Sequence, residues 1–117
     1  MAKNARKSNS INKPDGYIYI AKLNNFNNIF KIGVSSNVNR RISDLDASSP
    51  FGVSLVKSFF FKNVYNIEEC IHDNYDNDLI RREWFNLDNK EIDNIIFDLS
   101  FYSMQNLSLI LKKQWPD

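Results

Sequence analysis

Four polar residues have the types and spacing that could cleave a phosphodiester bond. They are Tyr19, Lys31, Arg41 and Glu68. Such hydrolysis needs a base that takes a proton from water, positive charge on the phosphate oxygens and usually a metal ion at the departing oxygen. Tyrosine is ordinarily a poor base because its pKa is near 10, but a neighbouring ammonium favours the phenolate. We therefore expect Lys31 to lie beside Tyr19 and to lower its pKa.

Each of these residues also has an ordinary structural explanation. Tyr17 and Tyr19 suit the half-exposed face of a β-strand. Arg40 and Arg41 suit the surface of a helix, and a helical glutamate such as Glu68 is usually solvated. Their joint occurrence in one small chain is what favours catalysis.

The hydrophobic pattern predicts a β-hairpin that positions the first two of these residues. Residues 17–23 and 29–34 are rich in β-branched and aromatic types, and an asparagine-rich connection joins them. Side chains of a strand point alternately to its two faces. The residues expected together on the polar face are Tyr17, Tyr19, Lys31 and Gly33.

A helix is predicted directly after the hairpin. Residues 38–46 repeat apolar side chains at helical spacing, and either Ser36 or Asn37 can cap the helix. Arg40 and Arg41 fall outside the apolar stripe, so both are available to a ligand.

The second half of the chain predicts one more strand and two more helices. Residues 53–61 are apolar on both faces, which suits a strand at the centre of a sheet. A helix over 64–75 places Glu68 and His72 four residues apart on one side. A further helix buries apolar residues between positions 92 and 99.

Length and composition limit these elements to one small domain. The 117 residues are 43% hydrophobic, enough for a single core. We predict an α/β domain with a small three-stranded, mostly antiparallel sheet flanked by helices, over residues 16–100. Residues 1–15 are expected to form a flexible basic arm, and residues 101–117 a helical tail packed on the domain.

Composition also excludes several kinds of site. With one cysteine, Cys70, and one histidine, the chain can form neither an internal disulfide nor a zinc site of Cys/His type. No apolar run approaches the roughly 20 residues of a membrane helix, so we expect a cytoplasmic protein.

The formal net charge of +1 conceals an uneven distribution. Residues 1–41 hold eight Lys or Arg against Asp15 alone, a net charge of +7, and the remaining 76 residues carry −6. A basic end of this kind attracts a polyanion such as a nucleic acid. The alternative interpretation is a solvated basic tail without a binding role. The residues expected to contact DNA phosphates are Lys3, Arg6, Lys7, Lys13 and Arg40.

The order of these residues resembles that of the GIY-YIG endonucleases. Tyr17-Ile18-Tyr19 stands where the first motif of that family belongs, and Lys31-Ile32-Gly33 follows at the spacing of the second. Arg41 and Glu68 then occupy the next two helices. The resemblance covers residues 16–87 and is closest to the phage and bacterial branch, which also has a Glu-Trp-Phe segment, here Glu83-Trp84-Phe85.

The resemblance implies a role for each residue. Tyr19 would activate water, Arg41 would contact the scissile phosphate and Glu68 would bind one Mg²⁺ or Mn²⁺ per active site. Tyr17 and His72 are further catalytic candidates. Asn86 is the candidate for an asparagine that the family has downstream of the glutamate.

We therefore predict a metal-dependent DNA endonuclease, encoded by a phage or mobile element, that acts as a monomer and nicks one strand per binding event. The main alternative is a catalytically silent DNA-binding module with the same fold. A third is a small RNA-binding protein, which the basic arm favours. A requirement for Mg²⁺ distinguishes the enzyme from a binding module.

Overall fold

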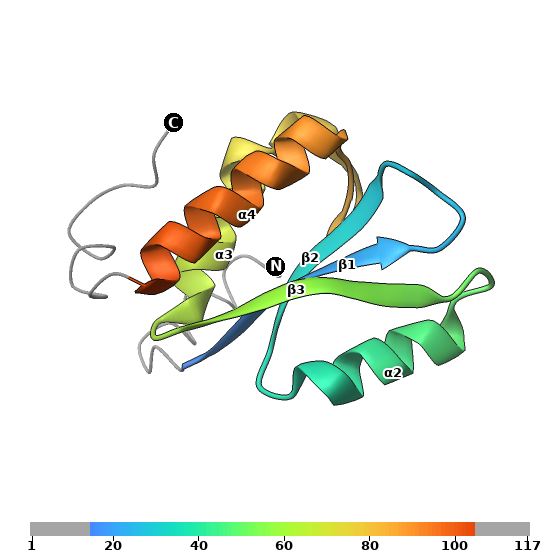
Figure 1. Cartoon of the computed structure of the whole chain (residues 1–117), viewed down its shortest axis with the longest axis horizontal. Helices are drawn as coiled ribbons and strands as arrows, with labels where there is room; N and C mark the ends of the chain where they lie inside the picture. The colour runs from blue at the N-terminus through green and yellow to red at the C-terminus, as the bar shows by residue number, and fades with distance from the viewer. Residues whose placement is uncertain (1–14, 105–117) are drawn as a thin grey trace.

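The computed structural model describes residues 15–104, which fold around one antiparallel β-sheet (Figure 1). Its strands are β1 (Gly16–Leu23), β2 (Ile29–Ser35), β3 (Val53–Phe61), β4 (Leu79–Arg81) and β5 (Trp84–Asn86), in the order β3-β1-β2-β5-β4. The helices are α2 (Val38–Ser48), α3 (Val64–Asn74) and α4 (Asn89–Met104), with a short 3-10 turn η1 (Asp76–Asp78). In Figure 1 the strands run between α2 below and α3 with α4 above.

The sheet has five strands, so the expectation of a three-stranded sheet was wrong. β4 and β5 form a second hairpin that pairs with β2 through β5. Each has only three residues, too few for alternating side chains to give a clear sequence signal. The third expected strand, β3, lies at the edge of the sheet rather than at its centre, and its apolar side chains Leu55, Val56 and Phe60 are exposed.

The first hairpin and its register confirm the expected faces. Tyr19 is directly opposite Gly33, and Ala21 is opposite Lys31. Paired residues of an antiparallel ladder point to the same side of the sheet. Tyr19, Gly33 and Lys31 therefore share one face, and Ile18 and Ile20 belong to the other.

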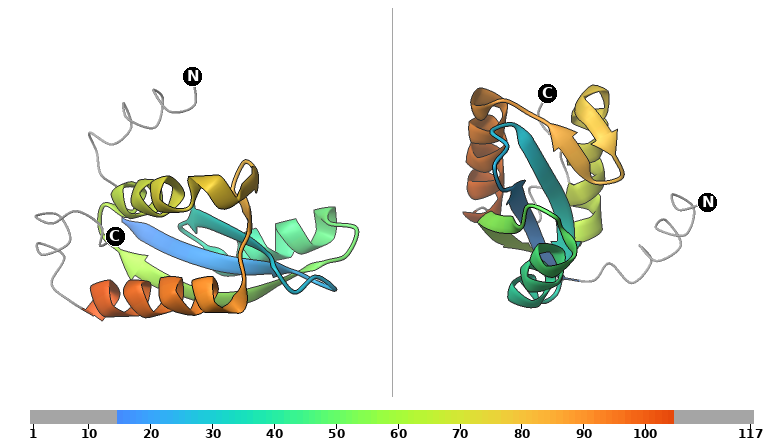
Figure 2. Two further views of the ribbon diagram at one scale, coloured as in Figure 1. Left: turned by 90° about the horizontal axis from the view of Figure 1, so that it is seen from above. Right: turned by 90° about the vertical axis from the view of Figure 1, so that its right-hand side faces the viewer.

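Each face of the sheet has its own apolar cluster, and the two clusters hold different helices. Ile18, Ile20 and Ile32 pack with buried residues of α3 and α4 in the larger core. Tyr19 and Ala21 pack with the apolar stripe of α2 in the smaller one. In the right-hand view of Figure 2, α3 and α4 lie on either side of the upper part of the strands and α2 lies below them.

The ends of the helices follow from capping groups and differ slightly from the predicted limits. Asn37 is the N-cap of α2, because its Oδ1 accepts a hydrogen bond of 3.1 Å from the backbone N–H of Arg40. Ser35 Oγ accepts the N–H of Asn37 at 3.0 Å. α4 continues to Met104, and residues 105–117 of the expected tail lie outside the described part. Between residues 15 and 104 no helix is long and apolar enough to span a membrane.

Candidate active site

A gap above Gly33 accommodates the hydroxyl of Tyr19. A Cβ atom added to Gly33 would lie 2.8 Å from Tyr19 Oη and 2.7 Å from Glu83 Oε1. A Cβ atom, which cannot form a hydrogen bond, does not approach oxygen atoms so closely, so a side chain at position 33 would displace one of the two groups. The glycine thus allows a phenol and a carboxylate to lie over the same point of β2.

The Tyr19 side chain is fully buried, and its hydroxyl makes no hydrogen bond of standard geometry to the described residues. Burial, followed by the charge of Glu83, raises its pKa from 10.0 to about 12. The guanidinium of Arg41 approaches the hydroxyl without reaching standard hydrogen-bond geometry and opposes this shift, and Glu68 adds a smaller increase. At pH 7 only roughly one molecule in 10⁵ therefore carries the phenolate.

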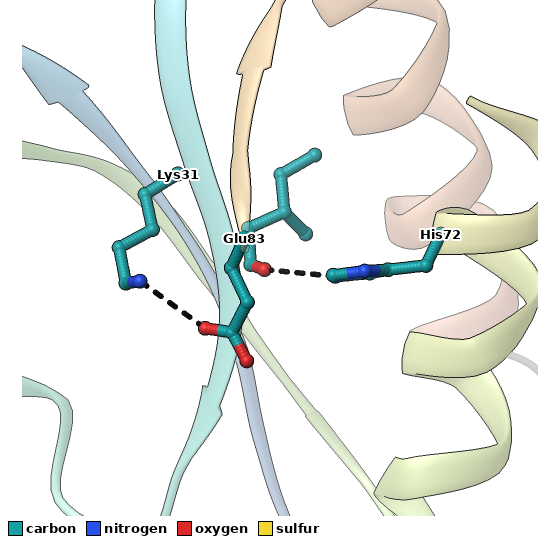
Figure 3. A network of polar contacts seen from close by, with 4 residues as sticks. Lys31, His72 and Glu83 are labelled. Atoms are coloured by element: carbon teal, nitrogen blue, oxygen red, sulfur yellow. Dashed lines mark hydrogen bonds and ion pairs between the residues drawn. The ribbon is translucent and has the colours of Figure 1, made fainter. Parts of the chain in front are cut away.

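Lys31 has a partner that was not expected from the sequence. Its Nζ lies 3.3 Å from Glu83 Oε1 (Figure 3). The same Nζ lies 5.4 Å from the centre of the Trp84 ring. Both members of the ion pair are mostly shielded from solvent, with side chains 12% and 27% exposed. The ammonium is thus engaged by a carboxylate, and the cation that favours the Tyr19 phenolate is Arg41.

Glu83 is the site residue that sequence reasoning overlooked. It lies in the two-residue turn between β4 and β5, after Arg82, whose φ of 56° is in the left-handed region. The backbone N–H of Ile32 donates a hydrogen bond of 3.1 Å to the Glu83 carbonyl. This contact ties the turn to β2. The available sequence signal was a glutamate next to the aromatic pair Trp84-Phe85, but no glycine or asparagine marked the turn.

α3 brings Glu68 to the site and fixes it through His72. The Nε2–H of His72 donates to the Ile32 carbonyl at 3.2 Å (Figure 3). The His72 ring packs edge-on against Phe85 with centroids 5.0 Å apart. His72 thereby attaches α3 to β2. Glu68, one turn earlier, is only 1% exposed, and its charge reaches Tyr19.

Arg41 lies at the exposed start of α2, beside a cleft of about 290 Å³. The cleft is lined by Ser35, Ser36, Asn37, Arg40, Arg41 and Asp44. Hydroxyl, amide and guanidinium groups of this kind are typical phosphate ligands in nucleic-acid complexes. Arg40 and Arg41 are both exposed at this cleft, and their binding of a ligand stays a prediction.

Two other candidates lie apart from the Tyr19 hydroxyl. Tyr17 is 37% exposed and packs edge-on against Phe60 with centroids 5.3 Å apart. It lines a second cleft of about 300 Å³, which shares Ser36 and Asn37 with the cleft beside Arg41. Asn86 accepts a hydrogen bond of 2.7 Å from Asn28 at the beginning of β2. The expected DNA contacts Lys3, Arg6, Lys7 and Lys13 lie outside the described residues.

The described residues contain no group of three or more His, Cys, Asp or Glu side chains that could hold a metal ion. A cation at this site would therefore depend on one or two carboxylates, with water and substrate supplying the remaining ligands. Mg²⁺ is commonly bound in this way, whereas structural zinc sites need four protein ligands. A buried carboxylate close to a buried phenol fits the first kind of site.

Fold and site together define a small α/β domain with a tyrosine, an arginine and two glutamates gathered on a twisted antiparallel sheet. The chain belongs to the T5orf172 domain family, whose model matches residues 16–100. This match corrects the expected membership of the GIY-YIG endonucleases, since a different family is found. The T5orf172 domain is phage-associated and often linked to nuclease activity or DNA binding.

No curated protein and no solved structure shows significant similarity to the chain.

Proposed function

We propose that the domain is a metal-dependent endonuclease that hydrolyses one phosphodiester bond of DNA per binding event. The main support is the convergence of ionisable groups on the buried hydroxyl of Tyr19. These groups come from three separate segments: Arg41 of α2, Glu68 of α3 and Glu83 of the β4–β5 turn. Ionisable clusters with strongly shifted pKa values are enriched at functional sites.

Arg41 is the residue suited to hold the scissile phosphate. It is exposed, lines the cleft at the start of α2 and acts electrostatically on Tyr19. A phosphate bound by its guanidinium would thus lie between solvent and the buried phenol. Guanidinium groups offer paired N–H donors that match the oxygens of a phosphate, and their charge offsets the charge that develops during attack.

Glu68 is the residue suited to bind the metal ion. Its carboxylate is buried, lies on a helix fixed to β2 and acts on Tyr19. Mg²⁺ or Mn²⁺, when bound, stabilises negative charge on the departing oxygen. The rigid support from His72 would keep the carboxylate in place while water and phosphate oxygens complete the coordination.

The raised pKa of Tyr19 also supports a second candidate, a DNA-binding module without catalysis. A phenol that stays protonated at neutral pH is a weak base by itself. Metal dependence separates the two functions. A binding module retains DNA with or without Mg²⁺, whereas the enzyme converts supercoiled plasmid only when Mg²⁺ is present.

The direct test compares plasmid cleavage by wild type, Tyr19→Phe and Glu68→Gln, in Mg²⁺ and in chelator. We expect each variant to lose cleavage by about 10²–10⁴-fold, because one lacks the ionisable oxygen and the other the metal-binding charge. Tyr65→Phe and Glu69→Gln are matched controls on α3 and should cut normally. If Tyr19→Phe retained turnover while Tyr17→Phe lost it, the assignment of the reactive tyrosine would be wrong.

A further inference from the structure

The burial of Tyr19 sets a condition on any reaction in which it accepts a proton. With a pKa of about 12, the hydroxyl keeps its own proton at neutral pH. A protonated phenol can take a proton from water only if it releases its own in the same step. A proton acceptor must therefore lie next to the Tyr19 hydroxyl.

Two contacts hold Glu83 over the same gap as that hydroxyl, although the two groups form no hydrogen bond in this structure, so the transfer requires them to approach each other when substrate binds. Its backbone carbonyl accepts the N–H of Ile32 at 3.1 Å, and its Oε1 is paired with Lys31 Nζ at 3.3 Å. The same Oε1 and Tyr19 Oη lie 2.7 Å and 2.8 Å from the point where a Gly33 Cβ would stand. Backbone and side chain thus hold the carboxylate over the gap that also contains the phenol.

The other charged neighbours of Tyr19 are less suitable acceptors. Arg41 is a donor without an acceptor site, and Lys31 as an ammonium is also only a donor. Glu68 has a smaller influence on Tyr19 than Glu83 and is the proposed metal ligand. Glu83 is the carboxylate whose charge acts most strongly on the phenol.

We propose that Glu83 is a positioning residue that acts through Tyr19 as the final proton acceptor. As the water oxygen bonds to phosphorus, a water proton passes to Tyr19 Oη and the phenol proton passes to the Glu83 carboxylate. One O–H bond of water and the phenol O–H bond break, two new O–H bonds form, and the bond from phosphorus to the departing oxygen breaks. Lys31 keeps the carboxylate directed at the phenol. This role rests on the proposed endonuclease function.

The first test measures the ionisation of Tyr19 and needs no cleavage. NMR of isotope-labelled tyrosine during an alkaline titration reports its pKa, and Tyr19→Phe identifies the signal. Glu83→Gln removes a negative charge and releases the ammonium of Lys31, so the pKa of Tyr19 should fall below about 12. Glu69→Gln is the control and should leave it unchanged. An unchanged pKa in Glu83→Gln would show that the carboxylate does not face the phenol and would overturn the proposal.

The second test measures single-turnover cleavage in Mg²⁺. Glu83→Gln should cut about 10²-fold more slowly than wild type, with unchanged affinity for DNA in chelator and with cooperative thermal unfolding retained. Glu83→Asp keeps the acceptor and should restore part of the rate. A Glu83→Gln variant that cuts like wild type would refute the role of Glu83 and leave the endonuclease function intact.

The pH profile of the wild-type rate distinguishes proton transfer through a neutral phenol from attack assisted by a phenolate. The charged groups facing Tyr19 are Arg41 of α2, Glu68 of α3 and Glu83 of the turn, and Glu83 is paired with Lys31 of β2. We expect the rate to stay nearly level between about pH 7 and 9, where the phenol remains protonated. A tenfold rise per pH unit would show that the phenolate reacts and would contradict the proposal. A wild-type protein that never cuts would refute both the function and this role.

Discussion

A tyrosine hydroxyl that is buried near two carboxylates holds its proton more tightly than one in water. For Tyr19 the pKa rises from 10.0 in the unfolded chain to about 12 in the folded protein. The resulting stabilisation is fully present below pH 10 and is lost as the pH rises toward 12. Two pKa units correspond to about 3 kcal/mol, of which roughly half is lost by pH 11.

Because the pKa of Tyr19 differs between the folded and unfolded states, the stability of wild type should depend more strongly on alkaline pH than that of Tyr19→Phe. The free energy of unfolding, measured in urea between about pH 8 and 11, should fall further for wild type, by about 1–2 kcal/mol. The variant has no phenol at position 19 to ionise, and all other groups titrate in both proteins. Equal losses would show that Tyr19 ionises as easily in the folded protein as in the unfolded chain.

At single residues, the sequence predicted the polar face of the hairpin but not the pairing of charges. Residue types and alternation suffice to place Tyr19 beside Gly33, because the register follows from two apolar strands. The partner of Lys31 depends on a turn in which Arg82 adopts a left-handed conformation, which is uncommon for arginine. Glu83 reaches the site only through that turn, so composition and spacing did not reveal its contact with Lys31.

At the level of the elements, the packing of the Tyr19 side chain of β1 over β2 depends on glycine at position 33, which has no side chain. Gly33→Ala would force its Cβ to within 3 Å of Tyr19 Oη and Glu83 Oε1, so one of these groups must move. We expect cleavage to fall at least tenfold, and unfolding to become easier by about 1–3 kcal/mol, as is typical of overpacking.

The matched control for this substitution is Gly16→Ala on the same hairpin. Its added Cβ would lie 3.3 Å from a Val64 side-chain carbon and 3.5 Å from the Ser35 backbone oxygen, and neither Tyr19 nor Glu83 is among its nearest atoms. Plasmid cleavage and thermal unfolding of the two variants should therefore differ clearly. Full activity of Gly33→Ala would show that the reaction does not require the observed approach of the phenol to Glu83.

Long elements with clear periodicity were predictable, and short or exposed ones were not. α2, α3 and α4 were recognised because their apolar residues recur at helical spacing and bury one stripe. The β4–β5 hairpin gave too little pattern, with three residues in each strand. β3 was placed at the centre because it is apolar on both faces, yet Leu55, Val56 and Phe60 are exposed at the sheet edge.

For the molecule as a whole, the excess of basic residues at the N-terminal end predicts how binding responds to salt. Lys3, Arg6, Lys7 and Lys13 are expected to add affinity without chemistry, each phosphate contact contributing about 0.9 to the slope of log K against log salt on duplex DNA. Deleting residues 1–13 should flatten that slope while leaving single-turnover cleavage by bound protein unchanged. An identical slope for both proteins would show that this segment makes no phosphate contacts.

The number of active sites also limits the product. One chain supplies one set of Tyr19, Arg41 and Glu68, so a monomer cuts one strand in each binding event. A double-strand break would need either a dimer with two sites or a second round of binding. The order in which open-circular and linear DNA appear therefore shows whether one or two active sites act in each binding event.

The most direct measurement follows supercoiled plasmid over time with Mg²⁺ at several protein concentrations, for wild type and Tyr19→Phe. We predict that wild type produces open circle before any linear DNA, that chelator stops the reaction and that Tyr19→Phe leaves the plasmid supercoiled. Linear DNA that rises without an open-circle intermediate, at a rate set by the square of protein concentration, would contradict the monomeric nickase. Plasmid that stays intact with wild type while DNA remains bound would contradict the endonuclease itself.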